Sequence, residues 1–144
     1  AASDVYKRQM QTFVQRARGT DVAAVIRPEA VSAIEQAKAL GYKLGILSNE
    51  LDLFYGADFR ERLPLLKNFD VIVDATYTGI LKPDPRAYQA CLQDLGVRAV
   101  QAVFVDDQAR NIEGAKACGL HVVTFDVFEP AQSFSTALQR LANL

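Results

Sequence analysis

The chain has 144 residues, the usual length of one globular domain. Hydrophobic residues make up 50% and charged residues 23% of the sequence, which excludes a disordered chain. Its 16 Lys and Arg residues against 17 Asp and Glu residues give a formal net charge of -1, and this balance provides no basic surface for nucleic acid or for an anionic membrane. No apolar run reaches the roughly 18 residues of a membrane span. From the charge balance and the lack of such a run, we expect neither a nucleic-acid nor a membrane partner.

Cys91 and Cys118 are the two cysteines of the chain. Each lies in a stretch with a helical pattern, so the sequence does not indicate a disulfide framework. Free thiols are typical of a reducing compartment, and the prediction is a cytoplasmic protein.

The first nine residues are set apart from the fold. The run from Asp4 to Gln9 resembles the translation of a transposase-type sequencing adapter, so we interpret residues 1–9 as an artefact and the chain as an N-terminally truncated fragment. The alternative is a natural polar N-terminal arm. A short amphipathic helix is then expected before Gly19, from the spacing of Met10, Phe13, Val14 and Ala17.

Strand and helix patterns alternate over the rest of the chain. Apolar runs bounded by turn residues predict strands at 43–47, 70–74, 102–105 and 121–125. Helical spacing predicts helices at 28–40, 58–67 (interrupted by Pro64), 85–95, 109–118 and around 134–141. Asp84 is the expected N-cap of the third helix, whose apolar face is Tyr88, Cys91, Leu92 and Leu95. The alternation predicts one α/β domain, a Rossmann-like parallel sheet with helices on both faces.

Three polar clusters follow predicted strands. Ser48 and Asn49 offer a hydroxyl, an amide and backbone N–H groups for an anion, although a plain turn would use the same residues. Asp106 and Asp107 are adjacent carboxylates that suit Mg²⁺, although a helix N-cap is the simpler alternative. Lys82 is held in extended backbone by Pro83, although a lone loop lysine is most often solvated. Ligands of open parallel sheets bind beyond the carboxyl ends of the strands, so the three clusters are expected to converge there.

The order of these clusters resembles the haloacid dehalogenase-like (HAD) hydrolase superfamily. The segments that carry the resemblance are similar to its second, third and fourth motifs: Leu44 to Asn49, Leu81 to Pro85, and Val103 to Asp107 continuing through Asn111 to Gly119. The resemblance covers about residues 28–125 and implies an HAD-like α/β core over 28–144. It also implies that residues 10–27 are the remnant of the helical cap of the first subclass.

The superfamily's first motif has no counterpart in this sequence. That motif is an Asp-x-Asp at the end of the central first strand, and it supplies the nucleophile and the acid/base. No Asp-x-Asp follows an apolar strand upstream of Ser48, so we expect the central strand to be missing and the chain itself to be inactive. The missing strand also predicts either a gap between the strands that end at Ser48 and Asp106 or a direct pairing of them.

The resemblance implies a role for each matching residue. Ser48 and the Asn49 backbone would bind phosphoryl oxygens, and Lys82 would neutralise their charge. Asp107 would bind Mg²⁺, Asp106 would hold Lys82 or a metal-bound water, and Asn111 would support them. His121, at a strand start, is interpreted as structural.

The resulting hypothesis is a Mg²⁺-dependent phosphatase that acts on a small phosphorylated metabolite through an aspartyl-phosphate. Two alternatives stay open. One is a 2-haloacid dehalogenase-type hydrolase, which would need no metal. The other is a non-catalytic α/β module that binds an anion. The sequence indicates neither the substrate nor the oligomeric state.

Overall fold

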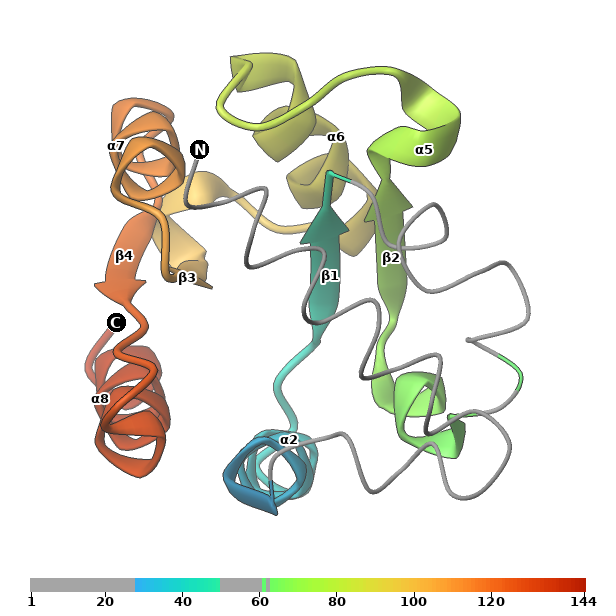
Figure 1. Ribbon diagram of the computed structural model, residues 1–144. Coiled ribbons are helices and arrows are strands. Elements are labelled where there is room, and N and C mark those ends of the chain that lie inside the picture. Colours follow the sequence, from blue (N-terminus) through green and yellow to red (C-terminus); the bar gives the residue numbers. More distant parts are fainter. Residues whose placement is uncertain (1–27, 50–60, 62) are drawn as a thin grey trace.

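The computed structural model describes residues 28–49, 61 and 63–144 (Figure 1). The described strands form two parallel pairs, β1 with β2 and β3 with β4. Helices pack around both pairs, so the Rossmann-like α/β class that the alternation predicts is confirmed. None of the helices in these residues is long and apolar enough to cross a membrane.

The elements follow one another in strict alternation along most of the chain. The first group comprises α2 (Pro28–Ala39), β1 (Gly45–Ser48), the 3-10 helix η2 (Pro64–Asn68), β2 (Val71–Asp74) and α5 (Ala75–Thr78). The second group comprises α6 (Pro85–Leu95), the 3-10 helix η3 (Ala99–Gln101), β3 (Val103–Asp106), α7 (Ala109–Ala117), β4 (His121–Thr124) and α8 (Pro130–Ala142).

The predicted ends of α6 are both confirmed. The Asp84 side chain accepts a hydrogen bond from the Arg86 N–H at 2.9 Å, and Pro85 occupies the first helical position, where no N–H is needed. Gly96 ends the helix with a φ of 71°, in the left-handed region that favours glycine. Local sequence therefore fixes the helix that follows Lys82.

Other boundaries differ from the sequence prediction. Ser48 and Asp106 are the last residues of β1 and β3, whereas the sequence placed each just beyond its strand, because the parallel ladders extend to these positions. The short helices α5 and η3 were not predicted; α5 forms because the Asp74 carboxylate accepts the Thr76 N–H and caps it. Of the helix expected at 58–67, the structure describes Glu61, which is helical, and residues 63–67, in which η2 starts at Pro64; residues 58–60 and 62 lie outside the described residues.

Each strand pair has its own helices. α6 packs against β1 and β2, while α7 and α8 pack against β3 and β4, and α2 contacts α8. The buried apolar side chains come from both pairs and their helices, chiefly Val73, Ala87, Tyr88, Ile112, Ala115, Val123 and Ala137. The core is therefore continuous through helix packing.

No backbone ladder joins the two pairs among the described strands. In Figure 1 the strands follow one another across the view as β4, β3, β1 and β2. All residues of β3 are only half-buried, and so are the last three residues of β1. Of the two outcomes that the sequence predicts for these strands, the direct pairing of β1 with β3 is not found in the described part of the chain.

Candidate functional site

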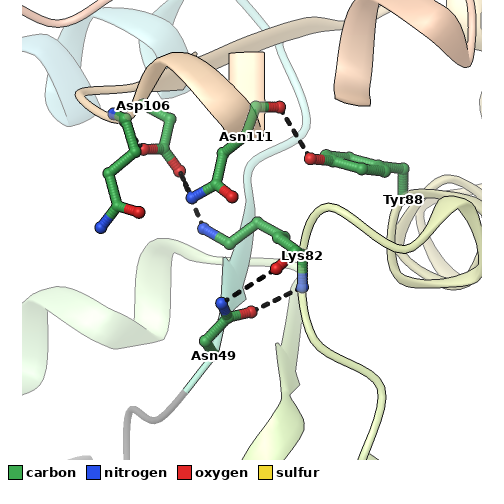
Figure 2. A network of polar contacts seen from close by, with 6 residues as sticks. Asn49, Lys82, Tyr88, Asp106 and Asn111 are labelled. Atoms are coloured by element: carbon green, nitrogen blue, oxygen red, sulfur yellow. Dashed lines mark hydrogen bonds and ion pairs between the residues drawn. The ribbon is translucent and has the colours of Figure 1, made fainter. Parts of the chain in front are cut away.

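An ion pair between Lys82 and Asp106 forms the centre of the candidate site (Figure 2). Lys82 Nζ lies 2.9 Å from Asp106 Oδ2, and the two side chains are only 10% and 9% exposed. The Lys82 ammonium also lies 5.5 Å from the centroid of the Phe104 ring, within the range of a cation–π contact. A charge pair so withdrawn from water needs further hydrogen bonds to be stable, and the structure supplies them.

Asn49, which follows β1, binds the backbone of Lys82. Its Oδ1 accepts the Lys82 N–H at 2.7 Å, and its Nδ2 donates to the Lys82 carbonyl at 3.3 Å (Figure 2). The amide of one residue therefore satisfies both backbone polar groups of another that is 33 positions away in sequence. The sequence offers the Asn49 amide only as a group that could bind an anion, and its clamp on the Lys82 backbone is a contact that the sequence does not indicate.

The Asp106 carboxylate is surrounded by donors. Besides Lys82, its Oδ1 accepts the Gln108 N–H at 2.8 Å, and its Oδ2 accepts a hydrogen bond from Asn111 Nδ2 at 3.2 Å. The Gln108 contact closes the turn that leads into α7, while Asn111 reaches back from the first turn of that helix. Lys82 and Asn111 thus donate to the same carboxylate oxygen of Asp106.

Ser48 and Asp107 lie at the same edge because each is the chain neighbour of a residue in this network. Ser48 ends β1 in register with Asp74, and Asp107 follows Asp106 at the end of β3. Lys82, Asn49, Asp106 and Asn111 are joined by direct contacts. Lys82 lies at the same sheet edge as Asp106 and Asp107. Its placement at the opposite edge would have contradicted the hypothesis drawn from the sequence.

His121 begins β4, in register with Val103 at the amino end of β3. Because the candidate site lies at the carboxyl end of the same strand pair, the histidine takes no part in it. Its backbone N–H donates to the Ala102 carbonyl.

A hydrated Mg²⁺ is compatible with the donors around Asp107. Partial removal from water and the adjacent Asp106 charge raise the pKa of the Asp107 carboxyl, so a nearby cation would favour its ionised form. Asn111 Oδ1 is a buried acceptor that receives no hydrogen bond from the described part of the chain. That part contains no group of three or more His, Cys, Asp and Glu residues arranged for a metal. These donors suit an ion that keeps waters and takes one or two carboxylates, rather than an all-protein cage.

Tyr88 is a contributor that sequence analysis assigned only to an apolar helix face. It is 1% exposed, and its hydroxyl donates to the Asn111 carbonyl at 2.7 Å (Figure 2). Burial and the Asp106 charge raise the pKa of this phenol to about 12, so it stays a donor at neutral pH. A polar end on an otherwise apolar helix face was the only sequence signal for this role.

Comparisons with known proteins identify the family of this chain. A family model described as haloacid dehalogenase-like hydrolase matches residues 4–119. Phosphatase MT3486 of Mycobacterium tuberculosis is 36% identical over 99 residues, which are 69% of this chain and 46% of that protein. (S)-2-haloacid dehalogenase 1 of a Pseudomonas species is 34% identical over 113 residues, which are 78% of this chain and 49% of that protein. The chain thus spans about half the length of these curated relatives.

Among solved structures, the fold is similar to that of an HAD phosphatase from Thermococcus onnurineus. The TM-score is 0.63 at 25% sequence identity, over 81% of this chain and 52% of that one. The family and the fold that the three motifs predict are both confirmed.

Proposed function

This chain belongs to the haloacid dehalogenase-like hydrolases, and we propose that it carries the phosphate-binding and Mg²⁺-binding side chains of a phosphatase acting on a small phosphorylated metabolite. The observation that carries the proposal is the shielded Lys82–Asp106 pair, clamped by Asn49 at the carboxyl edge of the strands. This edge is where ligands of open parallel sheets bind. The similarity to a phosphatase supports the substrate class.

Lys82 is suited to receive a phosphoryl group. An ammonium has three N–H donors, and Asp106 accepts one of them, so the others can reach phosphoryl oxygens. Because little water reaches the Lys82 side chain, its charge acts in a low-dielectric setting, where it stabilises developing negative charge most strongly. The Asn49 clamp fixes the lysine backbone and thereby aims the ammonium.

The remaining residues complete the proposed binding of phosphate and metal. Asp107 would hold Mg²⁺, with Asn111 behind it, and the ion would supply charge neutralisation at the phosphoryl oxygens. Ser48 and the Asn49 backbone would donate hydrogen bonds to those oxygens. In the proposed reaction an aspartate oxygen bonds to phosphorus as the ester oxygen leaves with a proton, and water then releases inorganic phosphate from the aspartyl-phosphate. The sequence offers no Asp-x-Asp for the nucleophile.

Titration calorimetry with inorganic phosphate and Mg²⁺ tests the binding part of the proposal on the chain itself. We expect phosphate binding that Lys82→Met weakens by about 10-fold or more, the usual scale for a lost charge-assisted hydrogen bond. Lys116→Met, at an exposed lysine near the end of α7, is the matched control and should leave the affinity unchanged. Equal affinities for the two variants would contradict the proposed role of Lys82.

Turnover separates the proposed phosphatase from the two alternatives. The chain should hydrolyse p-nitrophenyl phosphate no faster than its Asp107→Ala variant, whereas a version extended upstream by a strand bearing Asp-x-Asp, with its cap, should gain Mg²⁺-dependent hydrolysis. Metal-independent release of halide from a 2-haloacid by that version would favour the dehalogenase, to which the chain is also similar. Phosphate binding without either activity would favour the non-catalytic anion-binding module.

We also propose a reducing compartment, the cytoplasm. Cys91 and Cys118 are both free thiols, and burial raises the pKa of Cys91 to about 11, which keeps this thiol protonated and unreactive.

A further inference from the structure

Behind the ion pair, five residues form a closed circuit of contacts. Lys82 pairs with Asp106, which accepts a hydrogen bond from the side-chain amide of Asn111, and the backbone carbonyl of Asn111 accepts one from the Tyr88 hydroxyl. The Tyr88 ring then meets Phe104 edge to face, with centroids 5.4 Å apart and planes at 85°. Phe104 lies under the Lys82 ammonium and completes the circuit. Tyr88 contacts neither Lys82 nor Asp106 directly in this circuit. Its hydroxyl contacts a partner of Asp106, and its ring contacts a partner of Lys82.

Gly114 shows how closely α7 approaches the Lys82–Pro83 segment at the same place. A Cβ at this position would lie 2.7 Å from Pro83 Cβ, 2.8 Å from Tyr88 Oη and 3.1 Å from the Pro83 carbonyl oxygen. Any side chain there would force α7, α6 and the Lys82 loop apart, since two of the three clashes are with groups that cannot swing away. Three separate segments are thus in van der Waals contact around the Tyr88 hydroxyl.

The chemistry of this hydroxyl goes beyond packing. A phenylalanine would fill the same apolar space, whereas a buried hydroxyl costs free energy unless it is hydrogen-bonded. Its acceptor is the carbonyl of the residue whose amide donates to Asp106. The bond therefore fixes the first turn of α7 relative to α6, and with it the donor that orients the Asp106 carboxylate.

We infer that Tyr88 is a positioning residue that aligns the Lys82 ammonium through Asn111 and Asp106. The inference deepens the proposed function, because an aligned ammonium serves phosphate binding. One consequence does not depend on phosphate being the ligand. Without the Tyr88 hydroxyl, the Lys82 ammonium loses its fixed orientation and exchanges its protons with water more readily.

The test is Tyr88→Phe in the 144-residue chain, with the Lys82 ammonium observed by ¹H–¹⁵N NMR at low temperature. Loss of one buried hydrogen bond should accelerate proton exchange of this ammonium about fivefold and weaken Mg²⁺-dependent binding of inorganic phosphate by a similar factor. Tyr42→Phe removes a hydroxyl from the turn after α2 and should change neither quantity. If Tyr88→Phe only lowers the melting temperature and leaves the Lys82 ammonium signals as in the wild type, the tyrosine contributes to stability alone. That result would overturn the inference.

A second variant keeps the inference testable if Tyr88→Phe fails to fold. Asn111→Ala keeps the backbone carbonyl that accepts from Tyr88 but removes the amide that reaches Asp106. Faster exchange of the Lys82 ammonium in this variant is expected, and unchanged exchange would break the proposed path at its middle step. Absence of phosphate binding by the wild-type chain would contradict the proposed function, while the NMR comparison would still decide the role of Tyr88.

Discussion

The β1–β2 pair and the β3–β4 pair are built alike but bring different chemistry to the site. In each pair the strand nearer the middle of Figure 1 ends in a polar residue, Ser48 in β1 and Asp106 in β3. The first pair contributes the neutral Ser48 and Asn49, whereas the second contributes two adjacent carboxylates. Lys82 contacts both, through its backbone to Asn49 and through its ammonium to Asp106.

Because Lys82 contacts residues of both pairs, the candidate site also joins them. No backbone ladder crosses between them in the residues that the structure describes, so the Lys82 network and the helices hold them together. A substitution in this network should therefore affect both the binding of a ligand and the stability of the fold. The predictions below either break this connection or compare it with a matched site elsewhere.

The largest effect is expected at the edges of β1 and β3 that have no ladder partner among the described residues. A buried N–H or C=O left without a partner costs about 1–3 kcal/mol, and several together would approach the roughly 5–15 kcal/mol that holds a domain folded. We expect the 144-residue chain to melt below about 60 °C, the upper part of the ordinary range, and to associate as its concentration rises. Differential scanning calorimetry and sedimentation measure both properties. A monomer with a cooperative melt above that temperature would contradict the prediction.

The ion pair should give the next largest effect. Asp106→Ala leaves the Lys82 ammonium buried and unpaired, which should lower the free energy of unfolding by about 3–5 kcal/mol in denaturant titrations. The double variant Lys82→Met with Asp106→Leu should lose less, because no buried charge is left alone. The exposed Lys38–Asp70 pair provides the control, and Lys38→Met should cost no more than about 1 kcal/mol. Similar losses for Asp106→Ala and Lys38→Met would refute the central place of the buried pair.

Substitutions at two glycines compare the packing of α6 against β1 with the packing of α7 against the Lys82 loop. Gly114→Ala should lower the free energy of unfolding by about 1–3 kcal/mol, because its Cβ would meet Pro83 and Tyr88 within 3 Å. Gly45→Ala should cost less, since its nearest neighbours are the ends of Leu95 and Cys91, at 3.1 and 3.3 Å. Urea unfolding of both variants gives the order directly. The reverse order would mean that α6 sits on β1 more rigidly than α7 sits on the Lys82 loop.

The smallest effect is expected from pH at the N-cap of α6. The Arg86 side chain and backbone N–H lower the pKa of Asp84 below its usual 3.8, so the unfolded chain binds this proton first as the pH falls. Asp84 therefore contributes stability above pH 3.8 that is lost as the pH drops below it. Asp84→Asn keeps the cap but should show a shallower loss of stability between about pH 5 and 3. Parallel curves for the two proteins would rule out this contribution.

Much of the candidate site was predictable because parallel strands have a simple rule. Ser48 and Asp106 end apolar runs, and the carboxyl ends of parallel strands share one edge. Lys82 ends no strand, and its place follows from the cap of α6 that comes directly after it. The cap of α6 was equally predictable, since Asp84 and Pro85 satisfy the first turn by local chemistry alone. Similarly, Gly96 marks the helix end because its left-handed backbone is easiest for glycine.

The amino-acid pattern therefore predicts the alternating elements, the family and the residues at the carboxyl edge, because these depend on periodicity and on neighbours along the chain. Two contacts became visible only in the folded chain: the Asn49 clamp on the Lys82 backbone and the hydrogen bond from the Tyr88 hydroxyl to the Asn111 backbone carbonyl. These contacts join residues 33 and 23 positions apart. Hydrogen bonds over such separations depend on how α6 and α7 pack against the strands to within a few tenths of an ångström, and no local pattern in the sequence specifies that packing.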